Sequence, residues 1–228
     1  QWFFAGPNQH KTNVASSFFT VNQVRYNTLS LEPEARSFLY GDVATATLDT
    51  PAAGIPTWAV LFSALPTPSA ITAGGTGYNV QIAGYGGVGT GATGQTGGSD
   101  FRRRVAENVI GALTDLNQFE TFLFGSSTSP TQNLYFIDFD DPRRGLGGAS
   151  PFDFNAFRDN ARGAGTANPT EGTTAPGDSG GPLIVQNFGG RALIAGVLSG
   201  GYARFFNGQP QNGYGSVSFY QPLHLYWD

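Results

Sequence analysis

Alternation of apolar and polar side chains is the dominant pattern along this chain, and it predicts β-strands. Residues 17–21, 43–48, 57–62, 78–83 and 134–139 alternate in this way, which is the period of a strand with one buried face. The strongest hairpin joins 182–185 to 193–198, because a turn at 187–190 with two glycines separates two apolar runs. The pattern as a whole is typical of an all-β protein.

One segment, 100–119, is predicted to be helical. Asp100 is a suitable N-cap, and Val105, Val109, Ile110 and Leu113 follow at helical spacing. The last apolar segment, 223–227, fits either a short helix or a final strand. The glycine-rich stretch 84–98 and the polar stretch 140–176 are predicted to be long loops, which inside a compact domain are usually functional or mobile.

Composition agrees with many short strands joined by turns. The chain has 228 residues, of which 39% are apolar and 12% charged, and it contains 33 glycines and 14 prolines. Long surface helices need more charge on their outer face. The length is sufficient for a sizeable core, and all-β chains of this length often form one unit.

The charge balance argues against nucleic acid as a partner. The formal net charge is −4, whereas phosphate binding needs a basic footprint. Arg102, Arg103 and Arg104 form the one dense basic run, which we expect to be a solvated loop or a helix start. No apolar run is long enough to predict a membrane span.

The chain contains no cysteine and no methionine, and it begins at Gln1. A disulfide framework and a thiolate zinc site are therefore excluded. A start at Gln1 predicts a processed product, and with no membrane segment this fits a secreted, extracellular protein. A cloned fragment would look the same.

The most informative segment is the run Gly-Asp-Ser-Gly-Gly-Pro-Leu at 177–183. A serine hydroxyl needs a base to remove its proton, and the oxyanion that forms on the attacked carbonyl needs preplaced donors. Gly177 permits a turn that aims its own N–H and that of Ser179 into one small hole. Gly180 and Gly181 leave space around the serine. The alternative is a tight glycine-rich turn with an incidental serine, but the complete run, followed by the apolar hairpin, favours a nucleophile.

This run resembles the nucleophile motif of the trypsin-like (chymotrypsin-type) serine peptidases, and other segments resemble that family across most of the chain. Residues 41–48 resemble the family's Asp-Ile-Ala-Leu segment, and residues 83–86 resemble its Gly-Trp-Gly turn. Residues 195–201 resemble its strand ending in Ser-Trp-Gly, residues 213–217 resemble its Gly-Val-Tyr-Thr strand, and Trp227 resembles its C-terminal tryptophan. Gly200 stands where the family has tryptophan, which leaves that wall of the cleft more open.

The resemblance implies an all-β fold of two six-stranded antiparallel barrels, as in a bacterial-type secreted member without disulfides. The remainder of the N-terminal barrel would occupy 1–70, with its first strands missing from this chain. The C-terminal barrel, with nucleophile and specificity pocket, would occupy 71–228.

The resemblance also implies the site. Ser179 is the nucleophile, and Asp42 is the acid that holds an imidazole in one tautomer and stabilises the imidazolium formed during attack. The oxyanion hole is formed at Gly177, Asp178 and Ser179. Without the resemblance, Asp42 is a surface turn residue before a strand. Three further acids compete for the role, and we expect them to lie in a solvated loop because their spacing matches no EF-hand. They are Asp138, Asp140 and Asp141.

The chain has two histidines, and neither has the context of the family's catalytic histidine. His10 precedes Asp42 without the expected neighbours, and His224 falls in the C-terminal packing segment. Residues 2–6 resemble the strand that follows the family's histidine turn, so the alignment places the base before Gln1. We expect a cleaved N-terminal segment that stays bound as a second chain, since strand 2–6 would otherwise leave an unpaired sheet edge. His10 as the base is the alternative.

The resemblance places Thr173 at the base of the primary specificity pocket. Ser199, Gly200, Gly201 and Gly215 would form its walls. Threonine cannot hold a basic side chain through a buried charge pair, so cleavage after Lys or Arg is not expected. The glycines leave room for uncharged apolar or medium-sized side chains.

These observations predict a serine endopeptidase that acts on polypeptides through an acyl-enzyme at Ser179. Two alternatives remain: an esterase that uses the same site, and a catalytically dead pseudo-peptidase that serves as a binding module. No cofactor or metal is implied, and calcium binding is left open. The expected partners are a polypeptide substrate and the second chain that carries the histidine, without nucleic acid or membrane.

Overall fold

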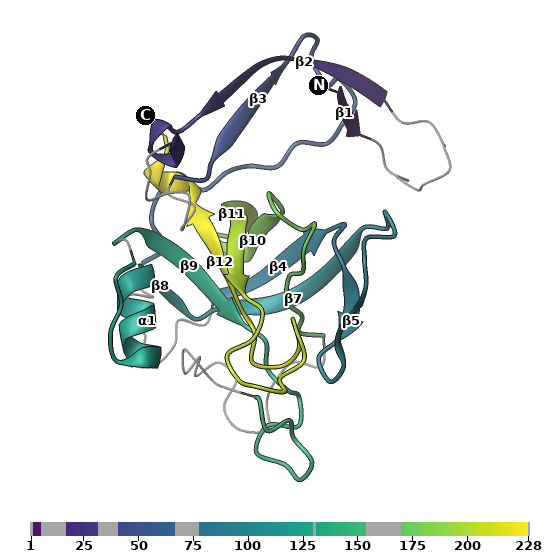
Figure 1. Ribbon diagram of the computed structural model, residues 1–228. Helices are drawn as coiled ribbons and strands as arrows, with labels where there is room; N and C mark the ends of the chain where they lie inside the picture. The colour runs from purple at the N-terminus through teal and green to yellow at the C-terminus, as the bar shows by residue number, and fades with distance from the viewer. Residues whose placement is uncertain are drawn as a thin grey trace.

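The computed structural model describes residues 2–5, 17–31, 41–66, 78–129, 131–153 and 170–227. Strands dominate these residues, and one short α-helix accompanies three antiparallel sheets (Figure 1). The predicted all-β class is therefore confirmed. No sheet in the described ranges closes into a barrel, so the two six-stranded barrels are not confirmed.

A seven-stranded sheet contains most of the core. Its order is β7 (Arg104–Ile110), β4 (Tyr78–Gly84), β10 (Pro182–Phe188), β11 (Arg191–Tyr202), β12 (Val217–Pro222), β9 (Asn133–Asp138) and β8 (Ala112–Asp115). Val80, Leu183 and Tyr220 are fully or almost fully buried in its main cluster. The strands predicted at 78–83 and 134–139 and the predicted hairpin are confirmed. Gly189 and Gly190 form the hairpin turn with φ of 61° and 78°, as a tight turn requires.

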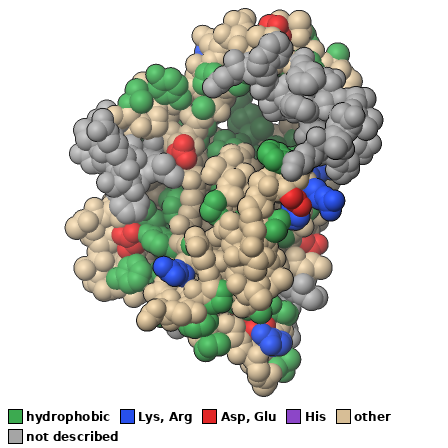
Figure 2. Space-filling view, turned by 45° about the vertical axis from the view of Figure 1, so that its right-hand side comes forward, with side chains coloured by type: hydrophobic (Ala, Val, Ile, Leu, Met, Phe, Trp, Pro, Cys, Tyr) green, Lys and Arg blue, Asp and Glu red, His purple; other side chains and the backbone are tan. Residues whose placement is uncertain are grey.

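A three-stranded sheet of order β1 (Trp2–Ala5), β2 (Ser17–Tyr26) and β3 (Ala44–Leu48) lies above the larger sheet (Figure 1). It confirms the strands predicted at 17–21 and 43–48. A 3-10 turn, η1 (Thr28–Leu31), follows β2. Most described side chains of β2 and β3 are exposed. Figure 2 shows a hollow beneath this upper part, with hydrophobic side chains at its floor.

The helix predicted at 100–119 is wrong for most of its length. Its first part forms β7, which pairs with all seven residues of β4, and its next part forms β8. Val105, Val109 and Ile110 satisfy helical spacing, but β-branched side chains also suit a pleated surface, and pairing with β4 decides between the two. Helix α1 (Leu116–Phe124) begins later, where the Asp115 carboxylate accepts a hydrogen bond from the Gln118 amide at 2.7 Å.

Two other segments differ from their predictions. Residues 57–62 form no strand and make one parallel bridge to Ile194. The Leu61 amide donates to the Ile194 carbonyl, and the Ile194 amide donates to the Ala59 carbonyl, both at 2.9 Å. Trp58 and Phe62 extend into solvent from this segment. The loop predicted at 84–98 contains a short hairpin of β5 (Val88–Thr90) and β6 (Gly94–Gly97). The described part of the loop at 140–176 contains no strand or helix.

The acids expected in a solvated loop are buried, so that expectation is wrong. Asp138, Asp140 and Asp141 are at most 1% exposed. Arg143 donates two hydrogen bonds to the Asp141 carboxylate, and Arg144 pairs with Asp140. Burial of Asp140 and Asp141 is possible because each carboxylate is paired with an arginine. This cluster fixes the loop at the lower end of the seven-stranded sheet.

The chain's C-terminal part ends in the 3-10 turn η4 (Leu223–Leu225), which agrees with the short-helix alternative for that segment. None of the helices in the described ranges has the length and apolar character needed to cross a membrane.

Candidate active site

The nucleophile turn (residues 177–181) presents Ser179 on an exposed loop directly before β10. Gly177 has φ of +98° and Gly180 has φ of +79°, conformations that side chains with a Cβ rarely adopt. The turn is anchored on both sides. Gly180 donates to the Leu198 carbonyl at 2.9 Å, and Gly181 donates to the Asp178 carbonyl at 2.8 Å.

Two peptide planes of this turn have fixed directions. The Pro176 carbonyl accepts a hydrogen bond from Gly87 at 3.0 Å, and the Asp178 carbonyl accepts one from Gly181. In a planar trans peptide the N–H points opposite to the C=O, so the amides of Gly177 and Ser179 point away from these anchors. Neither amide donates to an acceptor in the described part of the chain. They are two free donors beside an exposed hydroxyl.

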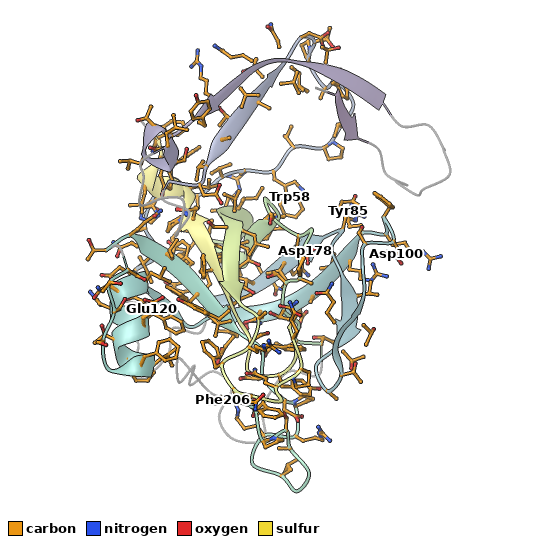
Figure 3. The ribbon with its side chains drawn as sticks, viewed as in Figure 1. Trp58, Tyr85, Asp100, Glu120, Asp178 and Phe206 are labelled. Carbon is orange, nitrogen blue, oxygen red and sulfur yellow. The ribbon has the colours of Figure 1, made fainter. Side chains whose placement is uncertain are left out.

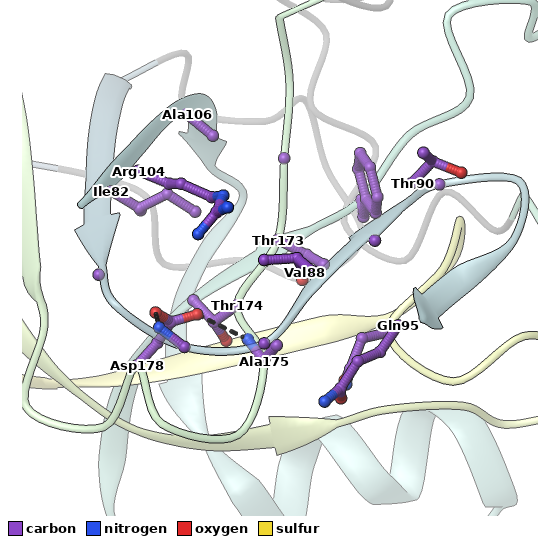
Figure 4. Close-up of a pocket in the computed structure, with 18 of the residues that line it drawn as sticks. Ile82, Val88, Thr90, Gln95, Arg104, Ala106, Thr173, Thr174, Ala175 and Asp178 are labelled. Carbon is purple, nitrogen blue, oxygen red and sulfur yellow. Dashed lines mark hydrogen bonds between the residues drawn. The ribbon is translucent and has the colours of Figure 1, made fainter. Parts of the chain in front are cut away.

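The third predicted donor is not available. The amide of Asp178 donates to the Ala175 carbonyl at 3.0 Å, so assigning it to the oxyanion hole was wrong. Its side chain has another position. The Asp178 carboxylate accepts from the Gly86 amide at 2.7 Å and from the Ala175 amide at 2.9 Å, and Figure 4 shows it among the residues that line a cavity of about 390 Å³.

Close packing against a glycine makes this position possible. A Cβ on Gly84 would lie 1.9 Å from the Asp178 carboxylate oxygen, which is far inside van der Waals contact. The carboxylate therefore ties the nucleophile turn to the end of β4 and the loop after it. Sequence reasoning assigned Asp178 by its amide and missed this structural role of its side chain.

The structure places Asp42, the predicted acid, in contact with β11. The hydroxyl of Ser199 donates to the Asp42 carboxylate at 2.9 Å. Ser199 is 5% exposed and also accepts a hydrogen bond from Gln221 at 3.2 Å. Its position results from a break in the β11–β12 register, in which Leu198 pairs with Tyr220 and Gly200 with Phe219. The extra residue of such a bulge is re-aimed out of the ladder, here toward Asp42.

One short path connects the acid to the nucleophile turn. Ser199 contacts Asp42 through its side chain, while the carbonyl of the preceding residue, Leu198, accepts from Gly180. The structure thus brings Asp42 into contact with Ser199, and joins the strand that carries Ser199 to the nucleophile turn through the Leu198 carbonyl. The contact between Asp42 and Ser199 joins the start of β3 to the large sheet.

The predicted pocket residues are linked through the serines at 216 and 218. Thr173 bonds to the hydroxyls of Ser216 and Ser218 at 3.2 Å, and Gly201 pairs with Ser218 across the ladder. Thr173 and Gly200–Gly201 therefore lie on one side of the turn, near Ser199. Gly215 directly precedes Ser216 in the chain and packs tightly, because a Cβ there would lie 2.0 Å from the Phe152 carbonyl. It packs against the loop after β9.

Of the two histidines, the structure describes His224 alone. His224 packs near Tyr135, with ring centroids 6.1 Å apart, and burial lowers its pKa. It makes no hydrogen bond to Ser179. His10 lies outside the described residues. The described ranges contain no group of three or more histidines and acids placed to hold a metal ion.

A second cavity of about 550 Å³ begins at the nucleophile turn and extends over β4. Ser179, Trp58, Tyr85 and Arg103 are among its lining residues, and Figure 3 shows Trp58, Tyr85 and Asp178 close together at this edge of the seven-stranded sheet. Trp58 and Arg103 were missed as site residues. A usable signal was present: one acid, Asp100, precedes three arginines and cannot pair well with all of them.

Neither a scan against protein-family models nor a search of curated proteins found a match for this chain. The proposed function therefore rests on the geometry of the nucleophile turn and of Asp42.

Proposed function

We propose that this protein is a serine endopeptidase that cleaves polypeptides through an acyl-enzyme at Ser179. The observation that carries the proposal is the pair of free amides at Gly177 and Ser179, each held in direction by an anchored carbonyl. Fixed amides beside an exposed hydroxyl suit the negative charge that develops during acyl transfer. Because both residues are exposed, the two amides are accessible to a bound carbonyl oxygen.

The contact between Asp42 and Ser199 supports a second part of the proposal, in which Asp42 orients the base. A buried hydroxyl holds one carboxylate oxygen, which leaves the other oxygen for an imidazole N–H. An imidazole fixed in this way presents its second nitrogen to the serine. Ser199 would then be a positioning residue for the acid.

We further propose that the base histidine is contributed by an associated N-terminal segment, which also completes the trypsin-like two-barrel fold. The support is the exposed three-stranded sheet, in which Val24 and Tyr26 are 46% and 55% exposed. Added strands would cover such apolar surface and remove an open edge. On this proposal Asp42 comes from the first barrel and Ser179 from the second.

Covalent labelling tests the nucleophile. The protein purified as it is naturally processed is treated with a fluorophosphonate probe, and intact mass and peptide mapping locate the adduct. We expect one adduct at Ser179, abolished in Ser179→Ala and retained in Ser126→Ala, an exposed serine after α1. Absence of labelling in the assembled protein would instead support a pseudo-peptidase, and turnover of esters without peptides would support an esterase.

The source of the base needs a separate experiment. N-terminal sequencing and intact mass of the purified active protein should reveal a second segment with a histidine. Loss of labelling in His10→Ala, in a preparation that contains only a single chain starting at Gln1, would overturn the two-segment proposal and assign the base to His10.

A further inference from the structure

The cavity over β4 has a composition that suits a charged peptide. We define the leaving-group groove by Ser179 at one end and by Trp58, Tyr85, Arg103 and Val105 along it; its volume is about 550 Å³. Trp58 is 53% and Val105 57% exposed. Large apolar side chains next to a cation form a surface with both aromatic walls and a charge.

The order of strands, together with the specificity pocket proposed on β11, indicates which part of a substrate would enter the groove. In the seven-stranded sheet β10 lies between β4 and β11, and the nucleophile turn directly precedes β10. The predicted pocket residues Ser199–Gly201 are on β11, whereas the groove lies over β4. An extended peptide that crosses Ser179 from the β11 side therefore reaches the β4 side with the residues after the scissile bond.

The charges along the groove are unevenly paired. Asp100 forms a bidentate pair with Arg104, with both oxygens at 2.7 Å, and lies 4.0 Å from Arg102. Arg103 has no carboxylate partner in the described ranges. Asp178 also lines the groove, but its carboxylate is occupied by the two backbone amides described above. In Figure 2 basic and acidic side chains adjoin on the right-hand side of the molecule.

We propose that the leaving-group groove selects substrates with an acidic side chain within the first three residues after the scissile bond. Arg103 supplies the charge, because its guanidinium is the one of the three that no described acid neutralises. Trp58 and Tyr85 pack against the neighbouring part of the peptide. This inference rests on the proposed peptidase function and adds a preference for the residues on the leaving-group side.

Matched peptides test the preference. Internally quenched peptides of one sequence carry Glu, Gln or Lys at the first, second or third position after the scissile bond. We expect kcat/KM for the best Glu peptide to exceed that of its Gln partner by about fivefold at low salt, as for an exposed ion pair. The ratio should fall toward one in about 0.5 M NaCl, which screens surface charges.

Two arginine variants separate Arg103 from its neighbours. Arg103→Gln should bring the Glu-to-Gln ratio to about one, while Arg102→Gln, which removes the same charge next to Asp100, should leave the ratio near fivefold. Equal cleavage of Glu and Gln peptides at all three positions would overturn the inference while leaving the peptidase proposal intact. So would a ratio that both variants reduce equally, because net charge alone would then explain it.

A binding measurement keeps the inference testable if no peptide is cleaved. Short peptides with the sequence after the scissile bond, with Glu or Gln, are titrated while tryptophan fluorescence is recorded, and Trp58→Phe identifies the reporter. Tighter binding of the Glu peptide that disappears in Arg103→Gln would support the groove even if labelling of Ser179 fails. No difference between the two peptides would reject it.

Discussion

The seven-stranded and the three-stranded sheet differ in how deeply their apolar side chains are buried. In the seven-stranded sheet, Val80 and Leu183 are completely buried, while in the three-stranded sheet Val24 is 46% and Tyr26 55% exposed. Both sheets come from the same alternating sequence pattern. The pattern indicates that a strand has one apolar face, but this face stabilises the fold only where a second layer covers it.

The residues of the candidate site come from both sheets. The nucleophile turn belongs to the well-packed sheet and is held by backbone hydrogen bonds and by Asp178. Asp42 precedes β3, in the sparsely covered sheet, and contacts Ser199 of the large sheet. The amide of the neighbouring Gly41 donates to Gln132, just before β9, at 3.4 Å. The surroundings of Ser179 are thus better fixed than those of Asp42.

Identical substitutions in the two sheets give the largest expected difference. Val80→Ala removes buried methyl groups from β4 and should lower the free energy of unfolding by about 2–3 kcal/mol. Val24→Ala in β2 should change it by less than about 0.5 kcal/mol, because that side chain is already half in water. Urea unfolding monitored by circular dichroism measures both. Similar losses would show that the three-stranded sheet is covered in solution.

Two glycine substitutions test how firmly the large sheet holds the nucleophile turn. Gly84→Ala places a Cβ 1.9 Å from the Asp178 carboxylate, so the turn must shift, and overpacking of this kind costs about 1–3 kcal/mol. We expect the rate of fluorophosphonate labelling at Ser179 to fall about tenfold.

The matched control for that prediction is Gly98→Ala, since a Cβ there meets nothing within 4 Å. It should label at the rate of the unchanged protein. If Gly84→Ala labels equally fast while circular dichroism shows it folded, the carboxylate of Asp178 does not position the turn.

Acid should weaken the loop below the large sheet by a smaller amount. The side-chain hydrogen bonds from Arg143 lower the pKa of Asp141 from 3.8 to about 2, against the opposing effect of burial. Because the folded pKa lies below the unfolded one, the stabilisation is present above about pH 4 and is lost as the pH falls toward 2. Arg143 is half exposed, so solvent screening limits the effect to about 1 kcal/mol.

Unfolding in urea at pH 5 and pH 2 tests this titration. Asp141→Asn should lose about 1 kcal/mol less than the unchanged protein between these two values. Asp49→Asn, at an exposed aspartate outside the large sheet, should lose as much as the unchanged protein. An unchanged pH dependence in Asp141→Asn would mean that the buried acids do not stabilise this region.

The sequence predicted the strands with clear alternation and the turn with positive φ at Gly177, because these depend on local chemistry. It mispredicted β7, since Val105, Val109 and Ile110 fit both periods and only the distant strand β4 decides between them. The burial of Asp140 and Asp141 was missed for another reason: their partners Arg143 and Arg144 are close in sequence, but the turn that pairs them shows no periodic pattern. The placement of Ser199 beside Asp42 depends on a bulge that no local sequence pattern predicts.

The bulge at Ser199 has a consequence for evolution and engineering. β11 runs from the tight glycine turn at 189–190 to the serine that contacts Asp42, a span of roughly 30 Å at the usual rise per residue. A slip of one residue along this strand would withdraw the Leu198 carbonyl from the turn and the Ser199 hydroxyl from the acid in a single event. Loop grafts at the far tip are therefore expected to disturb alignment at the centre, however distant they look on the surface.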